Sequence, residues 1–198
     1  IKLRYLINYA IRLYEEQGVQ IQNTNAEKEV LEFLKERMRN ILRIKNIKND
    51  IIEASISSHI GDNFLDLFRK NIVMSKYINK PVGKDVINSY KRASNIIESI
   101  NDRITGSPDA VLFRQDEEKA LFEKINEIRK DFTVKDDRKN YENLLIRMSE
   151  LKSFTDNFFD KVKVNDENKD IKNNRLELLK MYCNTFNNFV NFSKLDGL

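Results

Sequence analysis

Apolar residues recur every three or four positions along most of this chain, and that spacing is the strongest constraint on its fold. Such a period places them on one face of an α-helix, whereas a half-buried strand would need an alternating pattern. Only five glycines and two prolines occur among 198 residues, so long helices meet few interruptions. The sequence therefore predicts an all-α fold, a helical bundle with clear breaks at residues 80–83 and 105–108.

Helical periodicity is clearest in four stretches of the sequence. These stretches are residues 30–42, 86–104, 141–162 and 171–190. The patterns near residues 20–27 and 44–62 are weaker. An acidic triplet, Asp116, Glu117 and Glu118, suits the first turn of another helix, because the N-terminal end of a helix carries partial positive charge.

The stretch FFDKVKVNDENKDIKNNRLELL, residues 158–179, joins two apolar segments through a run of polar residues. A short polar connector is typical of two antiparallel helices, because its backbone groups can stay solvated. We therefore predict a solvated hinge at residues 165–170. The two phenylalanines that open the stretch are expected to pack near Tyr182 and Phe186 across a helical hairpin.

Arg175 interrupts the apolar face of the last predicted helix, one turn after Ile171. An unpaired charge in a partly buried position is costly, so this guanidinium must find an acceptor. Asp160 and Asp166, near the hinge, are the two carboxylates that could supply it. Arg175 is then predicted to fix the hinge to the last helix.

Charge is distributed unevenly along the sequence. Residues 1–88 carry 15 Lys and Arg against 11 Asp and Glu, whereas residues 89–198 carry 20 of each. Much of the excess comes from an acid-free run over residues 37–48. Such a run can follow phosphates, but it is more typical of the solvated face of a helix.

The inventory of reactive side chains points away from catalysis. The single histidine, His59, has no identifiable partner, and the single cysteine, Cys183, lies beside the apolar face of the last helix. Together they cannot form a zinc site, and the glycines are too scattered for a phosphate-binding loop. We expect this chain to hold no cofactor and to catalyse nothing alone.

Localisation and completeness can also be predicted from the sequence. No apolar run approaches the roughly 18 residues that a membrane-spanning helix requires. A lone cysteine fits a reducing cytosol, so we expect a cytoplasmic protein without membrane contact. The sequence opens at Ile1 inside an amphipathic pattern, from which we expect a piece of a longer protein.

Four short segments, taken in order, carry a family resemblance. They are YKRASNII at 90–97, FFDKVKV at 158–164, NRLELL at 174–179 and FSKL at 192–195. This order and spacing resemble the C-terminal part of the beta subunit of the bacterial two-subunit glycyl-tRNA synthetase, which ends in a DALR anticodon-binding domain. The acidic triplet resembles the start of the family's next helix. The resemblance is strong from Ser89 to Leu195 and looser, though collinear, before that.

The resemblance implies two regions and one function. Residues 1–88 would be a helical linker or body region, and residues 89–198 a DALR-like anticodon-binding domain. The chain would bind tRNA(Gly) and act in a hetero-oligomer with the alpha subunit, supporting attachment of glycine to that tRNA. ATP and Mg²⁺ would belong to the alpha subunit, so this chain would be a non-catalytic part of a glycine–tRNA ligase.

The sequence departs from the family pattern at two positions. Ile171-Lys172 stands where the family has a Leu-Arg pair, and lysine keeps the charge but loses the planar fork of arginine. Lys163 stands where the family usually has methionine, which puts one packing contact of the hinge in question.

Candidate RNA-binding residues can be chosen from the way in which proteins recognise single-stranded RNA. Unpaired bases are bound by stacking and by hydrogen bonds to their edges, which calls for arginines, amides and aromatic rings on a firm scaffold. The predicted tRNA-binding residues are Lys91, Arg92, Asn95, Ser99 and Arg103 on one helix, with Lys172 on the last helix. A second candidate stripe comprises Asn184, Asn187, Asn188 and Asn191.

Two alternatives remain open at this point. One is the similar anticodon domain of arginyl-tRNA synthetase, against which the Phe-Phe-Asp segment at 158–160 argues. The other is a non-catalytic helical scaffold that binds only protein, for which a gel shift with tRNA would be blank.

Overall fold

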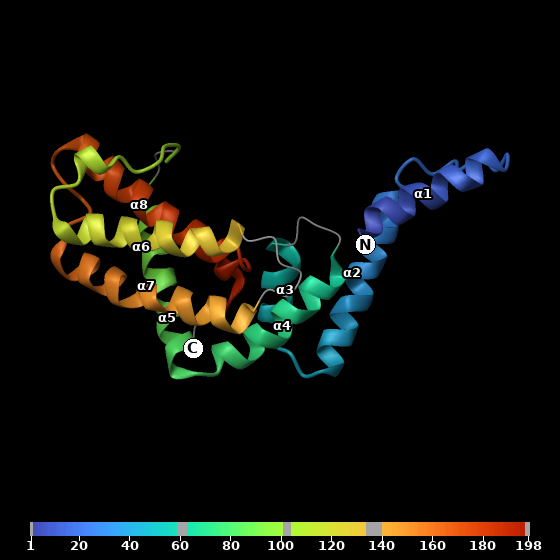
Figure 1. The fold of residues 1–198 in the computed structure, drawn as a ribbon, viewed down its shortest axis with the longest axis horizontal. Coiled ribbons are helices and arrows are strands. Elements are labelled where there is room, and N and C mark those ends of the chain that lie inside the picture. The colour runs from blue at the N-terminus through green and yellow to red at the C-terminus, as the bar shows by residue number, and fades with distance from the viewer. Residues whose placement is uncertain (1, 59–62, 101–103, 134–139, 197–198) are drawn as a thin grey trace.

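The computed structural model of the protein describes residues 2–58, 63–100, 104–133 and 140–196. These residues form α-helices and two short 3-10 helices, and no strand occurs among them (Figure 1). The α-helices are α1 (Leu3–Glu16), α2 (Ala26–Ile44), α3 (Asn49–Ser58), α4 (Phe64–Ile78), α5 (Pro81–Glu98), α6 (Asp116–Thr133), α7 (Tyr141–Lys161) and α8 (Lys169–Asn187). The 3-10 helices are η1 (Ala110–Leu112) and η2 (Phe192–Lys194). The predicted all-α fold is confirmed.

Local sequence sets where several helices begin. Pro81 occupies the start of α5, where a missing N–H costs nothing because that N–H has no partner within the helix. The side chains of Asn63, Asn140 and Asn168 accept hydrogen bonds from first-turn N–H groups of α4, α7 and α8. Because Asn168 caps α8, the polar connector between α7 and α8 covers residues 162–168.

Helices α5 to α8 pack as a group of four. Helix α6 lies against α7 and α8, and α5 lies against the same two helices from the other side. Helices α7 and α8 run in opposite directions and lie diagonally across the group from each other, as α5 and α6 do (Figure 1). The predicted pair of antiparallel helices joined by a polar connector is present, and the two helices meet through side chains in the core, where Tyr182 of α8 approaches Thr155 of α7.

Aromatic rings fill the centre of this four-helix group. The ring of Phe186 lies 5.0 Å from that of Tyr182, 4.9 Å from that of Phe192 and 6.2 Å from that of Tyr90, centroid to centroid. Phe158 of α7 is fully buried in the same hydrophobic core. Phe186 therefore packs on rings of α5, α8 and the C-terminal segment, within the core that also holds Phe158.

One hydrophobic core extends from Leu42 in α2 to Leu195 near the end of the chain. The C-terminal segment returns to α3, where the N–H of Asn191 donates to the carbonyl oxygen of Ala54 at 2.9 Å. The predicted boundary between residues 88 and 89 falls inside α5, within this shared core.

Helices α1 and α2 form an arm that points away from the rest of the molecule (Figure 1). Helix α1 packs against α2 and contains no buried residue. Large apolar side chains are exposed on the arm, among them Tyr5, Leu6, Tyr9, Leu13 and Tyr14 on α1 and Val30, Phe33, Ile41 and Ile44 on α2. Within the described residues, no helix has the length and apolar character needed to cross a membrane.

The basic run over residues 37–48 makes contacts within the protein. Arg39 binds Glu53 through two nitrogens, at 2.7 and 3.1 Å, and Arg43 donates to Asn49 at 3.2 Å. The ammonium group of Lys45 lies 5.8 Å from the ring centroid of Phe68. These contacts favour a structural role for the run over the alternative of phosphate binding.

Gly83 provides a test of the packing between α4 and α5. A Cβ at this position would lie 2.2 Å from the carbonyl oxygen and 2.9 Å from the carbonyl carbon of Tyr77, which are backbone atoms. We expect Gly83→Ala to destabilise the fold by about 1–3 kcal/mol, despite the higher helix propensity of alanine. Urea unfolding measures this change. Asn88→Ala, at an exposed position of the same helix, is the control, and equal stability of the two variants would contradict the close approach.

Candidate nucleic-acid interface

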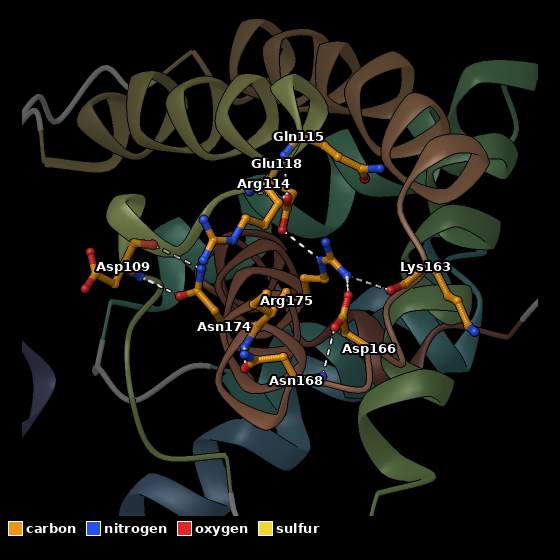
Figure 2. Close-up of polar contacts among 10 residues, drawn as sticks. Asp109, Arg114, Gln115, Glu118, Lys163, Asp166, Asn168, Asn174 and Arg175 are labelled. Atoms are coloured by element: carbon orange, nitrogen blue, oxygen red, sulfur yellow. Dashed lines mark hydrogen bonds and ion pairs between the residues drawn. The ribbon is translucent and has the colours of Figure 1, made fainter.

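Arg175 of α8 is only 4% exposed and forms the centre of a polar cluster. Its Nε donates to Oε1 of Glu118 at 2.9 Å (Figure 2). Its Nη1 donates to Oδ2 of Asp166 at 2.7 Å and to the carbonyl oxygen of Lys163 at 2.9 Å. One guanidinium therefore joins α6, α8 and the connector between α7 and α8.

The carboxylates around Arg175 differ in part from those expected. Asp166 accepts from Arg175, and the pKa of Asp166 is lowered by the backbone N–H of Asn168 and then by the Arg175 guanidinium. Asp160 lies exposed in the last turn of α7, and among the described residues Arg175 makes no hydrogen bond to it. Its proposed role as acceptor is therefore a correction: Glu118, which the sequence assigned only to a helix start, is the buried acceptor.

Glu118 is fully buried, and both of its carboxylate oxygens are bonded. While Oε1 accepts from Arg175, Oε2 accepts from the backbone N–H groups of Arg114 and Gln115, each at 2.8 Å (Figure 2). These donors precede α6, so the side chain caps the helix in the manner of a capping box. The charge-assisted hydrogen bonds offset the cost of removing both charges from water.

Asn174 holds a second segment next to the Arg175 cluster. This residue is 2% exposed, and its amide oxygen accepts from the N–H of Asp109 at 2.6 Å. Its amide nitrogen donates to the carbonyl oxygen of Asp109 at 3.0 Å (Figure 2). Two successive residues of α8 thus fix two segments: Asn174 fixes the loop over residues 104–115, and Arg175 fixes the connector over 162–168.

These segments meet at one end of the four-helix group. The first turns of α6 and α8, the last turn of α7 and the 3-10 helix η1 lie together at the left of Figure 1. Loops that carry binding residues are most effective when a rigid scaffold holds them in place. Buried hydrogen bonds from α6 and α8 provide such a scaffold at this end.

Lys91, Arg92 and Asn95 of the predicted RNA-binding residues lie on α5, and Ser99 is its C-cap. Arg92, Asn95 and Ser99 are exposed, and Lys91 is half-buried. The guanidinium carbon of Arg92 lies 4.2 Å from the ring centroid of Phe159 in α7, a cation–π contact. The hydroxyl of Ser99 donates to the carbonyl oxygen of Ile96 at 2.8 Å.

The other two predicted residues are placed differently. Arg103 lies outside the described residues, so its position relative to the α5 group is not defined. Lys172 is half-buried in the first turn of α8. The structure therefore assembles Lys91, Arg92 and Asn95 on α5 with Ser99 at its C-cap, while Lys172 belongs to the end where the two fixed segments meet.

The second candidate stripe is divided between structural and exposed positions. Asn187 accepts from the hydroxyl of Tyr90 at 3.2 Å and from the N–H of Phe192 at 3.0 Å. Asn191 caps η2. Both side chains position the C-terminal segment, so only Asn184 and Asn188 of the stripe are exposed.

The thiol of Cys183 is buried in the core and is unreactive. Burial raises the pKa of the Cys183 thiol to about 12, so it stays protonated and is a poor nucleophile near neutral pH. Within the described part of the chain, no group of three or more His, Cys, Asp or Glu side chains is placed to hold a metal ion. His59 lies outside the described residues.

Arg175→Met tests the buried cluster. Removing the guanidinium leaves the Glu118 carboxylate buried without its counter-charge, which should cost roughly 3–5 kcal/mol of unfolding free energy. Lys161→Met is the matched control, because Lys161 pairs with Glu117 at 2.9 Å but is 66% exposed. Exposed pairs contribute little, so the control should be far closer to wild type in urea unfolding. Equal stability of the two variants would show that the cluster does not support the fold.

Comparison with known proteins adds evidence about the family. The model of the DALR anticodon binding domain family matches residues 86–194, from α5 to η2. The chain is 35% identical over 190 residues to the glycine–tRNA ligase beta subunit of Rickettsia africae (strain ESF-5), covering 96% of this chain and 27% of that protein. It is 34% identical over 171 residues to the same subunit of Sulfurihydrogenibium sp. (strain YO3AOP1), covering 86% of this chain and 25% of that protein.

The predicted resemblance to the glycyl-tRNA synthetase beta subunit is thus confirmed as a similarity over nearly the whole chain. The chain spans about a quarter of the length of the curated relatives it matches. The family model, in turn, covers more than half of the chain and includes the interface residues described above. The chain therefore belongs to the DALR anticodon-binding domain family.

Proposed function

We propose that this chain is the anticodon-binding module of a glycine–tRNA ligase beta subunit. In this role it holds the anticodon region of tRNA(Gly) in the cytoplasm, while a separate alpha subunit binds ATP and Mg²⁺ and activates glycine. The observation that carries the proposal is the DALR family match over residues 86–194, which are the residues that build the four-helix group and its fixed end.

The chemistry of the α5 surface supports contact with unpaired bases. Arg92 presents one face of its guanidinium to Phe159 and is exposed, so the other face is available for stacking. Asn95 and Ser99 follow at helical intervals and offer groups that can bond base edges. Acidic and basic residues balance over residues 89–198, so we expect only about two to four phosphate contacts. A plot of the logarithm of the tRNA binding constant against the logarithm of the salt concentration should then have a slope of roughly −1.5 to −3.

Arg92→Ala is the variant that tests this assignment. Loss of one stacking contact should weaken binding of tRNA(Gly) by about 1–3 kcal/mol, measured by fluorescence anisotropy at fixed salt. Arg129→Ala, at an exposed position of α6, is the matched control and should bind like wild type. Thermal melts of both variants check that the fold is intact.

Each result of this experiment has a separate meaning. Failure of the wild-type protein to bind tRNA(Gly) would overturn the proposed function and favour a protein-binding scaffold. Preference for tRNA(Arg) over tRNA(Gly) would favour the arginyl-tRNA synthetase alternative. Unchanged binding by Arg92→Ala would remove α5 from the interface. Glycine-dependent exchange of ATP and pyrophosphate by this chain alone would refute its non-catalytic role.

A further inference from the structure

The loop over residues 104–115 is attached to the bundle at its first residue, its middle and its end. The ammonium group of Lys180 donates to the carbonyl oxygen of its first residue, and the amide of Asn174 binds its middle. Glu118 accepts from the last two N–H groups, and Phe113 packs edge-to-face against an aromatic ring of α6. Connecting loops are ordinarily the mobile parts of a domain, and this one is held from beneath by buried polar groups.

This fixed loop presents two side chains that contribute nothing evident to the fold. Val111 is 83% exposed, more than any other large hydrophobic side chain in the described part of the chain. Arg114 is exposed, and its guanidinium makes no hydrogen bond or ion pair with another described residue. Buried hydrogen bonds therefore fix the backbone from which an apolar side chain and an arginine project at the surface.

The charges around the loop indicate what it could bind. Besides Arg114, the exposed side chains between residues 109 and 119 include Asp109, Asp116 and Lys119, so acidic and basic groups are mixed along this stretch rather than forming a run of one sign that would follow a phosphate backbone. Unpaired bases have flat faces and polar edges, which suit a guanidinium that can stack and donate hydrogen bonds. The neighbouring apolar side chain of Val111 adds contact area without charge.

We propose that the loop over residues 104–115 is a second contact for unpaired RNA bases, with Val111 and Arg114 as the contacting residues. This inference rests on the proposed function and adds a surface that is distinct from the α5 group. Asn174 and Glu118 act as positioning residues, because they fix the loop before RNA arrives. Because the loop is already ordered, RNA binding loses little conformational entropy there, which favours affinity.

Cysteine labelling measures contact at Val111 directly. The sequence contains one cysteine, Cys183, which is buried and holds its proton, so it reacts slowly with a maleimide. In a Val111→Cys variant the introduced thiol is exposed and should label fast. With tRNA(Gly) at about 100 times its Kd, labelling should slow by roughly tenfold or more, because almost all of the protein is bound. Ile146→Cys, at a position on α7 that is 60% exposed, is the control and should label at the same rate with or without tRNA.

Arg114→Ala tests the chemistry of the contact. Loss of one base contact should weaken tRNA(Gly) binding by about 5- to 150-fold, with little change in the salt slope. If the salt slope of Arg114→Ala is smaller in magnitude than that of wild type by about one, Arg114 contacts a phosphate, and its proposed recognition of a base is overturned.

The remaining outcomes separate this inference from the proposed function. Undiminished labelling of Val111→Cys by a protein that binds tRNA(Gly) would overturn the inference and leave the function standing. Protection by a protein partner but not by tRNA would also overturn it. Absence of tRNA binding by the wild-type protein would overturn the proposed function itself.

Discussion

The buried ion pair between Arg175 and Glu118 connects the parts of the molecule that the proposed interface needs. Two charges removed from water are costly, and their mutual attraction offsets that cost only when the remaining hydrogen-bonding groups are also satisfied. Here Arg175 also bonds Asp166 and a connector carbonyl, while Glu118 also bonds two backbone N–H groups before α6. Because the pair spans α6 and α8, the order of one end of the bundle depends on both residues together.

Rigidity at this end links the fold to the proposed function. Adjacent residues of α8, Asn174 and Arg175, hold the loop over 104–115 and the connector over 162–168. A surface that reads unpaired bases needs side chains at fixed positions, because stacking and edge contacts are short-ranged. Both supported segments lie within residues 86–194, which the DALR anticodon binding domain family model matches.

Sequence periodicity indicated most of the helices, since helical spacing and caps are local properties. It was weak over α3, and the break expected at residues 80–83 is wrong in part, because Pro81 starts α5. The sequence also predicted a buried Arg175 with Asp166 as an acceptor, because the two residues lie close in sequence. Glu118 is 57 residues from Arg175, and no local pattern brings them together. Asn187 looked like part of an exposed stripe for the same reason: its partner Tyr90 is distant in sequence. The placement of α7 opposite α8 depends on how α5 and α6 pack, which periodicity does not determine.

A double-mutant cycle between Glu118 and Arg175 is the most direct measurement of whether the pair acts as a unit. Unfolding free energies are measured in urea for Glu118→Gln, Arg175→Met and the double variant. If the two side chains support each other, the unfolding free energies lost in the two single variants should add up to more than the loss in the double variant. The difference, the coupling energy, should be about 1–3 kcal/mol. Additive losses within about 0.5 kcal/mol would show that the two residues act independently, and would contradict the account of a shared support for the interface.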